Sequence, residues 1–353
     1  MTMCESFAMY RLPGASHCVK IGGSGLQPDE LYSYTDLEKK DGFVFAPFKI
    51  SSDYPLLLFR QEKVETFSPD SVPDFSETDF KRPEIADERK TYSYVFEKFH
   101  SLLEQDICRK IVLSRTSLYH TDENIKPETL FMRACSLYPE AFVALVSAPR
   151  CGVWLIATPE ILTQCHNGLF RTMSLAGTMR QRHGDNPRKS TVVDWDKKNI
   201  KEQAFVSDYI ADVLGRMAVD VKKSKPYTTA SGEVCHITND FTFRLSDGTT
   251  LGRLLQELHP TSAVCGMPKT YTYDFINDNE GRCREYYSGF AGPLSKNGDV
   301  DLFVTLRCMK ISDYSCKLYA GGGLVTESEE ETEWLETEAK METMRKCLAI
   351  REI

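Results

Sequence analysis

Short apolar runs joined by tight turns fill the middle of this 353-residue chain, and they limit its fold more than any other feature. The runs AFVALVSA and GVWLIATP, at 141–148 and 152–159, surround the turn sequence PRCG and predict a β-hairpin. Because strands joined by hairpins run antiparallel, we expect antiparallel sheet. Further strand-like segments lie at 42–50 with 55–61, 110–119, 168–180, 301–311 and 316–325.

Amphipathic helices interrupt these strands. Tyr94, Phe96, Phe99 and Leu103 recur at helical spacing and predict a helix over 91–106. Helices are also expected over three later segments, 127–139, 194–217 and 250–260. Strands with helices packed outside them predict a fold of the α+β class.

The net charge of the chain excludes some classes of binding partner, and its cysteines indicate the cellular compartment. A net charge of −8 gives no basic surface for nucleic acid or for an anionic membrane, so neither is an expected partner. No run approaches the about 18 apolar residues of a membrane span, and the N-terminal MTMCESFAMYRLPG lacks the pattern of a signal peptide. Twelve scattered cysteines without a C-x-x-C pair favour reduced thiols in a cytoplasmic protein. The polar, proline-containing segment 68–90 predicts a surface connection.

The C-terminal helix is rich in glutamate, and helical geometry divides its residues into strips. Ser328 followed by Glu331 is a capping-box pattern, so the helix is expected to start there. The apolar strip consists of Trp334, Met341, Met344 and Leu348. A strip expected to be solvated contains Glu331, Glu338 and Glu342, near Arg345 and Lys346. On this strip, the substitution Glu338→Gln is expected to be nearly silent.

A third strip of this helix borders the apolar residues and contains Glu329, Glu333, Glu336 and Lys340. Carboxylates at the edge of a core are costly unless they are paired or bound to a metal ion. Spacing alone favours a salt bridge from Glu336 to Lys340, four residues later. Metal binding is the alternative.

Glu202 is a second carboxylate beside apolar residues, because it precedes Phe205 and Val206 by one helical turn. The simpler interpretation is an ion pair with Lys198. Alternatively, the two helices converge and their carboxylates form a site for Mg²⁺, which keeps few protein carboxylates and fills its other positions with water and substrate oxygens.

Three further residues have two interpretations each, and one glycine segment has a single, weak one. Lys110, at the start of a strand, either reaches solvent or lies desolvated and acts as a base, and Glu160 in ATPEIL has the matching ambiguity. Arg307, expected in the middle of a strand, is either a paired core arginine or an anion clamp. The glycines at 321–323 allow close approach of an anion, but they match neither the Walker nor the Rossmann spacing.

Seven blocks in order resemble the chorismate-utilising enzymes: KIVLSR, ATPEIL, LAGTMR, HPTSAVCG, VTLRCMK, YAGGGLV and EWLETEAK. That family includes the isochorismate, salicylate, anthranilate and aminodeoxychorismate synthases. The resemblance runs from about residue 92 to the C-terminus, and before it only GFVFAPF matches loosely. It implies one domain over 1–353, with a variable part at 1–90 and a catalytic core at 91–353. It also implies two antiparallel sheets packed face to face, helices outside them, and a cleft for chorismate and Mg²⁺.

The resemblance assigns roles to individual positions. Glu202 and Glu336 match the metal-site glutamates of the family, and Glu333 matches an acidic position beside them. Positions that match the substrate-binding residues are Gly177, Thr178, His259, Ala263, Arg307, Gly321, Gly322, Gly323 and Lys340. Among these, Arg307, the three consecutive glycines and Lys340 would hold substrate carboxylates, and His259 would lie near the ring.

A few positions separate the branches of the family. Members that add water carry lysine where Lys110 stands, whereas amine-adding members typically have glutamine. Ala176 replaces the nucleophilic lysine of some aminodeoxychorismate synthases, and Ala263 stands where pyruvate-eliminating members usually have threonine. The resemblance is therefore closest to the isochorismate-forming branch, with a salicylate synthase as the alternative and an inactive chorismate-binding module as a more distant one.

In the isochorismate-forming branch, water adds at C2 of chorismate and the C4 hydroxyl leaves, with Lys110 as the implied base and Glu160 as the implied acid. The resemblance to this branch implies a monomer without a glutaminase subunit. It leaves open whether menaquinone, a catechol siderophore or salicylate is made from the product.

Overall fold

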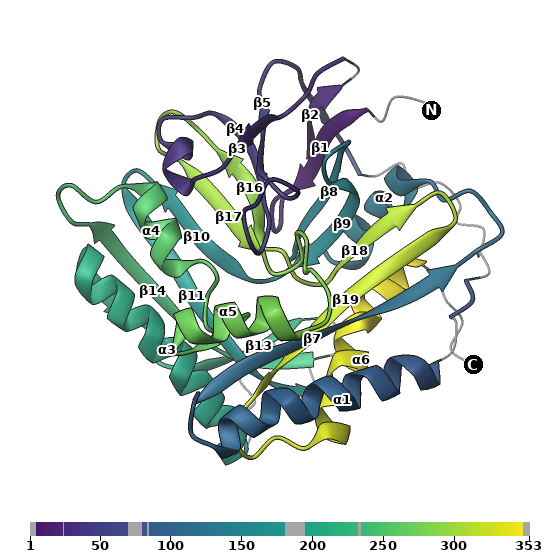
Figure 1. Cartoon of the computed structure of the whole chain (residues 1–353). Helices are drawn as coiled ribbons and strands as arrows, with labels where there is room; N and C mark the ends of the chain where they lie inside the picture. Colours follow the sequence, from purple (N-terminus) through teal and green to yellow (C-terminus); the bar gives the residue numbers. More distant parts are fainter. Residues whose placement is uncertain are drawn as a thin grey trace.

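Two large antiparallel sheets form the protein in a computed structural model that describes residues 5–23, 25–69, 80–82, 85–180, 195–231 and 234–348 (Figure 1). The first sheet has the strand order β15 (Gly266–Met267), β7 (Lys110–His120), β19 (Ser315–Leu324), β18 (Cys308–Ser312), β9 (Gly152–Thr158), β8 (Phe142–Ala148), β1 (Ser6–Arg11), β2 (Cys18–Gly23) and β6 (Val64–Phe67).

The second sheet has the order β12 (Ala218–Lys223), β14 (Val234–Leu245), β11 (Leu169–Arg180), β10 (Ile161–His166), β17 (Val300–Val304), β16 (Phe290–Leu294), β4 (Gly42–Ala46), β5 (Leu56–Arg60) and β3 (Asp29–Leu31), and β13 (Tyr227–Ser231) also pairs with β14. Strands from the first 67 residues extend one end of both sheets, at the top of Figure 1.

The two sheets pack face to face through an aromatic layer. Phe142 of β8 stacks on Phe303 of β17 with ring centroids 4.3 Å apart, and Phe45 of β4 stacks on Tyr286 at 4.2 Å. These side chains belong to one buried cluster that draws residues from both sheets. The alternation of side chains along each strand supplies such an inward-facing row.

Helices cover the outer faces of the sheets. The helices are α1 (Ile85–Glu104), α2 (Pro127–Leu137), α3 (Lys197–Met217), α4 (Leu251–Leu258), α5 (Lys269–Asn279) and α6 (Glu330–Leu348), with a 3₁₀ turn η1 (Tyr34–Leu37). Apolar residues of α3 and α4 pack on the second sheet, and those of α2 and α6 pack on the first. The expected α+β fold, two antiparallel sheets face to face with helices outside, is confirmed. Among the described residues, no helix is long and apolar enough to cross a membrane.

The expected helices differ from the observed ones mainly at their ends. The first helix begins at Ile85, inside the segment 68–90 that was expected to be a connection; of that segment, 70–79 and 83–84 lie outside the described residues. Tyr94 is 64% exposed, and the buried face of α1 instead includes Tyr92, Val95 and Phe96. The spacing Tyr94 to Phe96 is two residues, which turns the two side chains to different faces.

The last helix starts at Glu330, two residues after the expected start at Ser328. The carbonyl of Glu329 accepts the first helical hydrogen bond, from the Glu333 amide, so Glu329 occupies the N-cap position. The hydroxyl of Ser328 accepts from the Val325 amide, and thus closes the turn before the helix.

Arg307 lies between two strands and not inside one, contrary to the expectation. The segment 301–311 divides into β17 of the second sheet and β18 of the first. Arg307 adopts a φ of 47°, the left-handed region, which ends strand geometry at that residue. The chain therefore crosses from one sheet to the other at Arg307.

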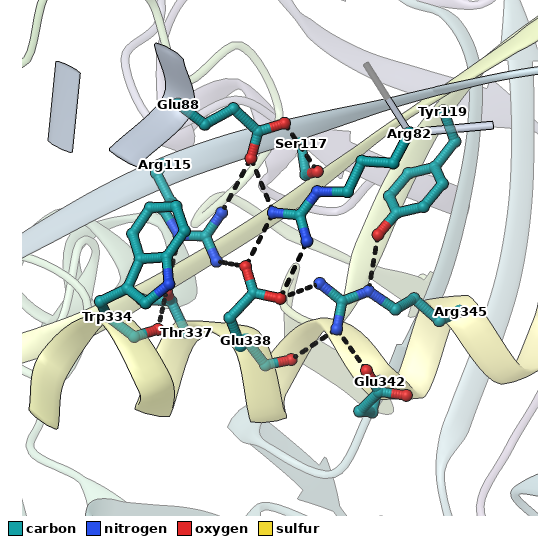
Figure 2. A network of polar contacts seen from close by, with 10 residues as sticks. All are labelled: Arg82, Glu88, Arg115, Ser117, Tyr119, Trp334, Thr337, Glu338, Glu342 and Arg345. Carbon is teal, nitrogen blue, oxygen red and sulfur yellow. Dashed lines mark hydrogen bonds and ion pairs between the residues drawn. The ribbon is translucent and has the colours of Figure 1, made fainter. Parts of the chain in front are cut away.

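The expectation of a solvated strip on α6 is wrong for Glu338 and Glu342. Their side chains are only 18% and 19% exposed, and Figure 2 shows Glu338 among three arginines and Glu342 beside Arg345. Glu331, by contrast, is 67% exposed, as expected. Helical geometry separates the strips but does not reveal that α1 and β7 cover one of them.

The cysteines agree with the expected reduced state. The eleven cysteines of the described residues are all free thiols, and ten of them are buried as small apolar side chains. The twelfth, Cys4, lies outside the described residues.

Candidate active site

A cavity opens where the ends of both sheets meet α3 and α6. Strands β7, β11, β14 and β19 contribute lining residues, as do two of the segments where the chain crosses between the sheets. Nine of the residues expected in a site line it: Glu160, Gly177, Thr178, Glu202, Ala263, Arg307, Gly321, Gly323 and Lys340.

Lys110 is completely buried beside this cavity, so its side chain does not reach solvent. Its Nζ donates to the carbonyl of Ser262 at 3.0 Å and lies 3.2 Å from Oε1 of Glu202. Glu202 therefore pairs with Lys110, and not with Lys198 as spacing had suggested. A Cβ at Gly323 would lie 2.1 Å from Glu202 Oε1 and 2.7 Å from Lys110 Cε, so only glycine fits between strand and ion pair.

Glu160 lies two residues after the end of β9 and is also buried. Burial raises the pKa of its carboxyl group to about 7, although the positive charges of Lys110, Arg307 and Lys340 act to lower it. A carboxyl group with this pKa is present in both protonation states near neutral pH. It is able to donate a proton as well as accept one.

Glu160 and Arg307 occupy two of the places where the chain passes between the sheets, and hydrogen bonds join these two places. The amide of Val304 donates to the carbonyl of Glu160 at 2.9 Å, and the amide of Ala157 donates to the carbonyl of Arg307 at 3.0 Å. The backbone at Glu160 and the backbone at Arg307 are thus each anchored to a neighbouring strand.

His236 holds the guanidinium of Arg307. Nη2 of Arg307 donates to Nε2 of His236 at 2.9 Å, so the proton of the neutral imidazole is on Nδ1, which donates to the carbonyl of Gly177 at 3.0 Å. Burial lowers the pKa of His236 well below its usual value, and the charges of Arg307 and Lys340 lower it further. The two partners of Arg307, His236 Nε2 and the Lys340 carbonyl, are uncharged, so its positive charge stays available to an anion.

The bulge at Gly177 in β11 places Thr178 opposite His236. Gly177 has a φ of 70°, and a Cβ there would meet the backbone oxygen of Asn199 at 3.0 Å. Asn199, in the first turn of α3, accepts from the Thr178 amide through Oδ1 at 2.9 Å. The hydroxyl of Thr178 also contacts the carboxylate of Glu336. The start of α3 therefore fixes this turn of the cavity wall.

The strip of α6 with Glu333, Glu336 and Lys340 lies against the glycines of β19. Lys340 Nζ donates to Glu336 Oε1 at 2.5 Å and to the Gly321 carbonyl at 2.9 Å, so the expected salt bridge is present. A Cβ at Gly322 would lie 3.0 Å from Oε2 of Glu333 and 3.5 Å from Oε1 of Glu336. The bare strand thus leaves room for these carboxylates.

These two carboxylates have unequal affinities for a proton. Burial and the neighbouring Glu336 raise the pKa of Glu333 to about 7. For Glu336, burial opposes ionisation, but Lys340 outweighs it and lowers the pKa, with help from Lys198. Lys198 also binds Oε1 of Glu333, whereas Oε2 is buried without a hydrogen-bond partner.

The donor set fits a hard cation such as Mg²⁺. The partnerless Glu333 oxygen and the ionised Glu336 carboxylate are potential oxygen ligands, and Gly322 leaves space beside them because it has no side chain. Among the described residues, no three His, Cys, Asp or Glu side chains form a ready-made metal centre. Mg²⁺ commonly binds through one or two carboxylates and completes its shell with water and substrate oxygens, so it does not need such a centre.

Comparison with known proteins gives the family. Residues 55–349 match the family described as chorismate binding enzymes. The chain belongs to this family.

Individual chorismate binding enzymes are distant in sequence but similar in fold. A vibriobactin-specific isochorismate synthase of Vibrio cholerae is 27% identical over 240 residues, which are 67% of this chain and 60% of that protein. An isochorismate synthase of Bacillus subtilis is 30% identical over 276 residues, 73% of this chain and 69% of that one. A crystal structure from Bacillus anthracis, described as a 2,3-dihydroxybenzoate-specific isochorismate synthase, superposes with a TM-score of 0.83 at 22% identity, covering 98% of this chain and 97% of that one.

In this chorismate binding enzyme, the placement of His259 near the substrate ring stays a prediction. His259 does not line the cavity; it is buried against Phe290 and Tyr34, with ring centroids at 5.1 and 5.7 Å. Burial lowers the pKa of His259 to about 3, so its imidazole is neutral near pH 7. The histidine that does line the cavity is His236, which the sequence analysis did not single out. Its only signal is its strand register opposite Thr178, which a sequence does not display.

Proposed function

We propose that this protein is an isochorismate synthase, which converts chorismate into isochorismate by adding water at C2 and expelling the C4 hydroxyl. The observation that carries the proposal is a completely buried Lys110 beside a cavity that also holds Glu160, whose pKa is raised to about 7. Water needs a base to become a good nucleophile, and the departing hydroxide needs an acid. The relatives from Vibrio cholerae and Bacillus subtilis carry the same name, which supports the proposal.

In the proposed reaction, Lys110 in its uncharged form removes a proton from the attacking water, and Glu160 in its protonated form protonates the leaving hydroxyl group. The Ser262 carbonyl and Glu202 orient the lysine Nζ. The pKa of about 7 keeps a large share of Glu160 protonated at neutral pH. Acid and base groups of this kind typically contribute about 10²–10⁴-fold each to the rate.

The substrate is a dianion, and the cavity offers it two cations. Arg307 keeps its positive charge, because burial lowers its pKa only to about 10. Lys340 of α6 lies beside the glycines of β19, and there Gly321 and Gly323 allow a ring to approach the strand backbone. We infer that these groups hold the two carboxylates of chorismate and exclude alternative orientations.

The proposal includes a requirement for Mg²⁺, held by Glu202 and Glu336 with Glu333 beside them. Bound there, Mg²⁺ would neutralise and orient the ring carboxylate of the substrate. The partnerless Oε2 of Glu333 and the space beside Gly322 support this assignment.

The decisive experiment is incubation of the purified protein with chorismate, with and without Mg²⁺, followed by chromatography of the products. We expect isochorismate, formed up to an equilibrium mixture, and no product after a chelator has removed the metal. Accumulation of salicylate and pyruvate without a partner lyase would establish the salicylate synthase alternative. Binding of chorismate without turnover would identify a binding module. Anthranilate formed with ammonia would contradict the role given to Lys110.

The same preparation tests the proposed assembly. Because water is the nucleophile, the isolated chain should be active without a glutaminase subunit. We also propose that the protein is a monomer and that it acts in the cytoplasm. Size-exclusion chromatography with light scattering, run under the conditions of the activity assay, measures the molar mass and so tests whether the protein is a monomer.

A further inference from the structure

Six charged side chains, of which one is buried and five are partly buried, join α6 to β7 and α1 (Figure 2). We call them the arginine–glutamate cluster: Arg82, Glu88, Arg115, Glu338, Glu342 and Arg345. None of their side chains is more than 19% exposed. Three positive and three negative charges balance, which buried charges require.

Glu338 is the centre of this cluster. Its carboxylate accepts from both terminal nitrogens of Arg82, at 3.0 and 2.8 Å, and also from Arg115 and Arg345. Arginine–carboxylate contacts of this forked kind fix direction as well as distance. The three arginines approach from the segment before α1, from β7 and from the next turns of α6 itself.

Arg115 grips α6 at three successive points. Its guanidinium stacks on the ring of Trp334 at 3.7 Å, its Nε donates to the hydroxyl of Thr337 at 2.6 Å, and its Nη2 donates to Glu338. Arg115 follows Lys110 by five residues on β7, so the two side chains point to opposite faces of that strand. The strand that carries the proposed base therefore also holds the helix.

Glu338 lies two residues from both Glu336 and Lys340, so it projects from nearly the opposite side of the helix. The apolar strip between these sides contains Met341 and Met344, and methionine adapts its shape to its surroundings. The hydrophobic effect is non-directional, so burial of this strip sets the rotation of the helix about its axis only coarsely. The forked ion pairs of Glu338 set that rotation more narrowly.

Rotation matters because the site side chains lie off the helix axis. With side chains, an α-helix has a radius of about 5–6 Å, so a rotation of about 10° moves a carboxylate by roughly 1 Å. A displacement of about 1 Å at reacting groups can cost about 10²-fold in rate.

We propose that the arginine–glutamate cluster sets the rotation of α6, and that Glu338 and Arg115 are positioning residues for Glu336 and Lys340. The proposal rests on the proposed function in taking Glu336 and Lys340 as ligand-binding groups. Neither Glu338 nor Arg115 lines the cavity, so they act through the helix.

The test compares Glu338→Gln with Glu331→Gln, a matched change on the same helix at an exposed position that pairs with Arg89. Calorimetric titration with Mg²⁺ is the first measurement, and steady-state kinetics with chorismate is the second. For folded Glu338→Gln, measured well below its unfolding temperature, we expect Mg²⁺ binding at least about tenfold weaker and kcat lowered about 10–10²-fold. Glu331→Gln should match the unchanged protein in both.

Wild-type Mg²⁺ affinity and kcat in folded Glu338→Gln would overturn the proposal and leave a role in stability alone. Arg115→Lys is the second variant: it keeps the charge but loses the fork and the stacking, and it should shift both measurements in the same direction. If Glu338→Gln does not fold, Arg115→Lys carries the test with the same criteria. If the unchanged protein binds Mg²⁺ but does not convert chorismate, the proposed function fails while the titrations still decide the positioning role.

Discussion

The two charged sides of α6 use the same residue types with opposite results. On the cavity side, Glu333 shares Lys198 with its neighbours, keeps one oxygen without a partner and has a raised pKa. On the other side, three arginines surround Glu338 and lower its pKa to about 2, although burial alone would raise it. A saturated carboxylate holds structure, and an unsaturated one is available to a ligand.

The largest effect should come from the cavity side, through Lys110→Gln. We expect kcat to fall by about 10²–10⁴-fold, because the base is lost while the anion-binding groups remain. Chorismate binding, measured by calorimetry, should change little. Turnover near the wild-type rate would remove Lys110 from the mechanism.

On the opposite side, Glu338→Gln should cost stability. The folded pKa of about 2 lies below the value of 4.5 for a free glutamate, so Glu338 stabilises the fold above pH 4.5, and this contribution is lost as the pH falls towards 2. Two to three pKa units correspond to about 3 kcal/mol at neutral pH. Urea unfolding at pH 7 and at pH 3 checks the sign: the difference between Glu338→Gln and the unchanged protein should shrink at low pH.

The substitution Glu160→Gln should change the free energy of unfolding in the opposite direction. The pKa of Glu160 in the fold, about 7, is above the free value of 4.5, so its contribution is fully present below pH 4.5 and is lost as the pH rises through 7. Replacing it with neutral glutamine should therefore raise the free energy of unfolding at pH 8 by up to about 3 kcal/mol, while activity is lost. Equal stability of the two proteins at pH 8 would show that Glu160 is not penalised by burial.

The smallest effect should be that of Glu331→Gln. This glutamate pairs with Arg89 at the surface and is 67% exposed, and exposed pairs contribute little. A change within about 0.5 kcal/mol is expected in thermal unfolding. A larger loss would mean that the arginine–glutamate cluster extends to the exposed edge of α6.

Local patterns in the sequence were sufficient for much of the fold. The hairpin of β8 and β9 and the strand β7 follow from apolar runs and turn residues, which act over a few neighbours. The break at Arg307 was missed because one residue in the left-handed region interrupts a run whose composition remains that of a strand.

The residues of the site also differ in how far the sequence alone could predict their roles. Family blocks placed Glu160, Arg307 and Lys340 at the cavity, but helical geometry alone left Glu336 between a salt bridge and a metal ligand. His236 was missed because its importance depends on which strand lies beside its own. The burial of Glu338 depends on α1 and β7, which are more than 200 residues earlier in the chain.

The hydrogen-bonded crossings at Glu160 and Arg307 give the aromatic layer between the sheets an additional meaning. Each crossing is anchored in both sheets, so the spacing of the sheets also sets the spacing of the proposed acid and the anion-binding arginine. The stacked rings of Phe142 and Phe303 thus act as a spacer whose thickness is transmitted to the reacting groups. A change of side-chain volume in this layer, remote from any ligand, would therefore alter the distance between Glu160 and Arg307 and with it the rate of the reaction.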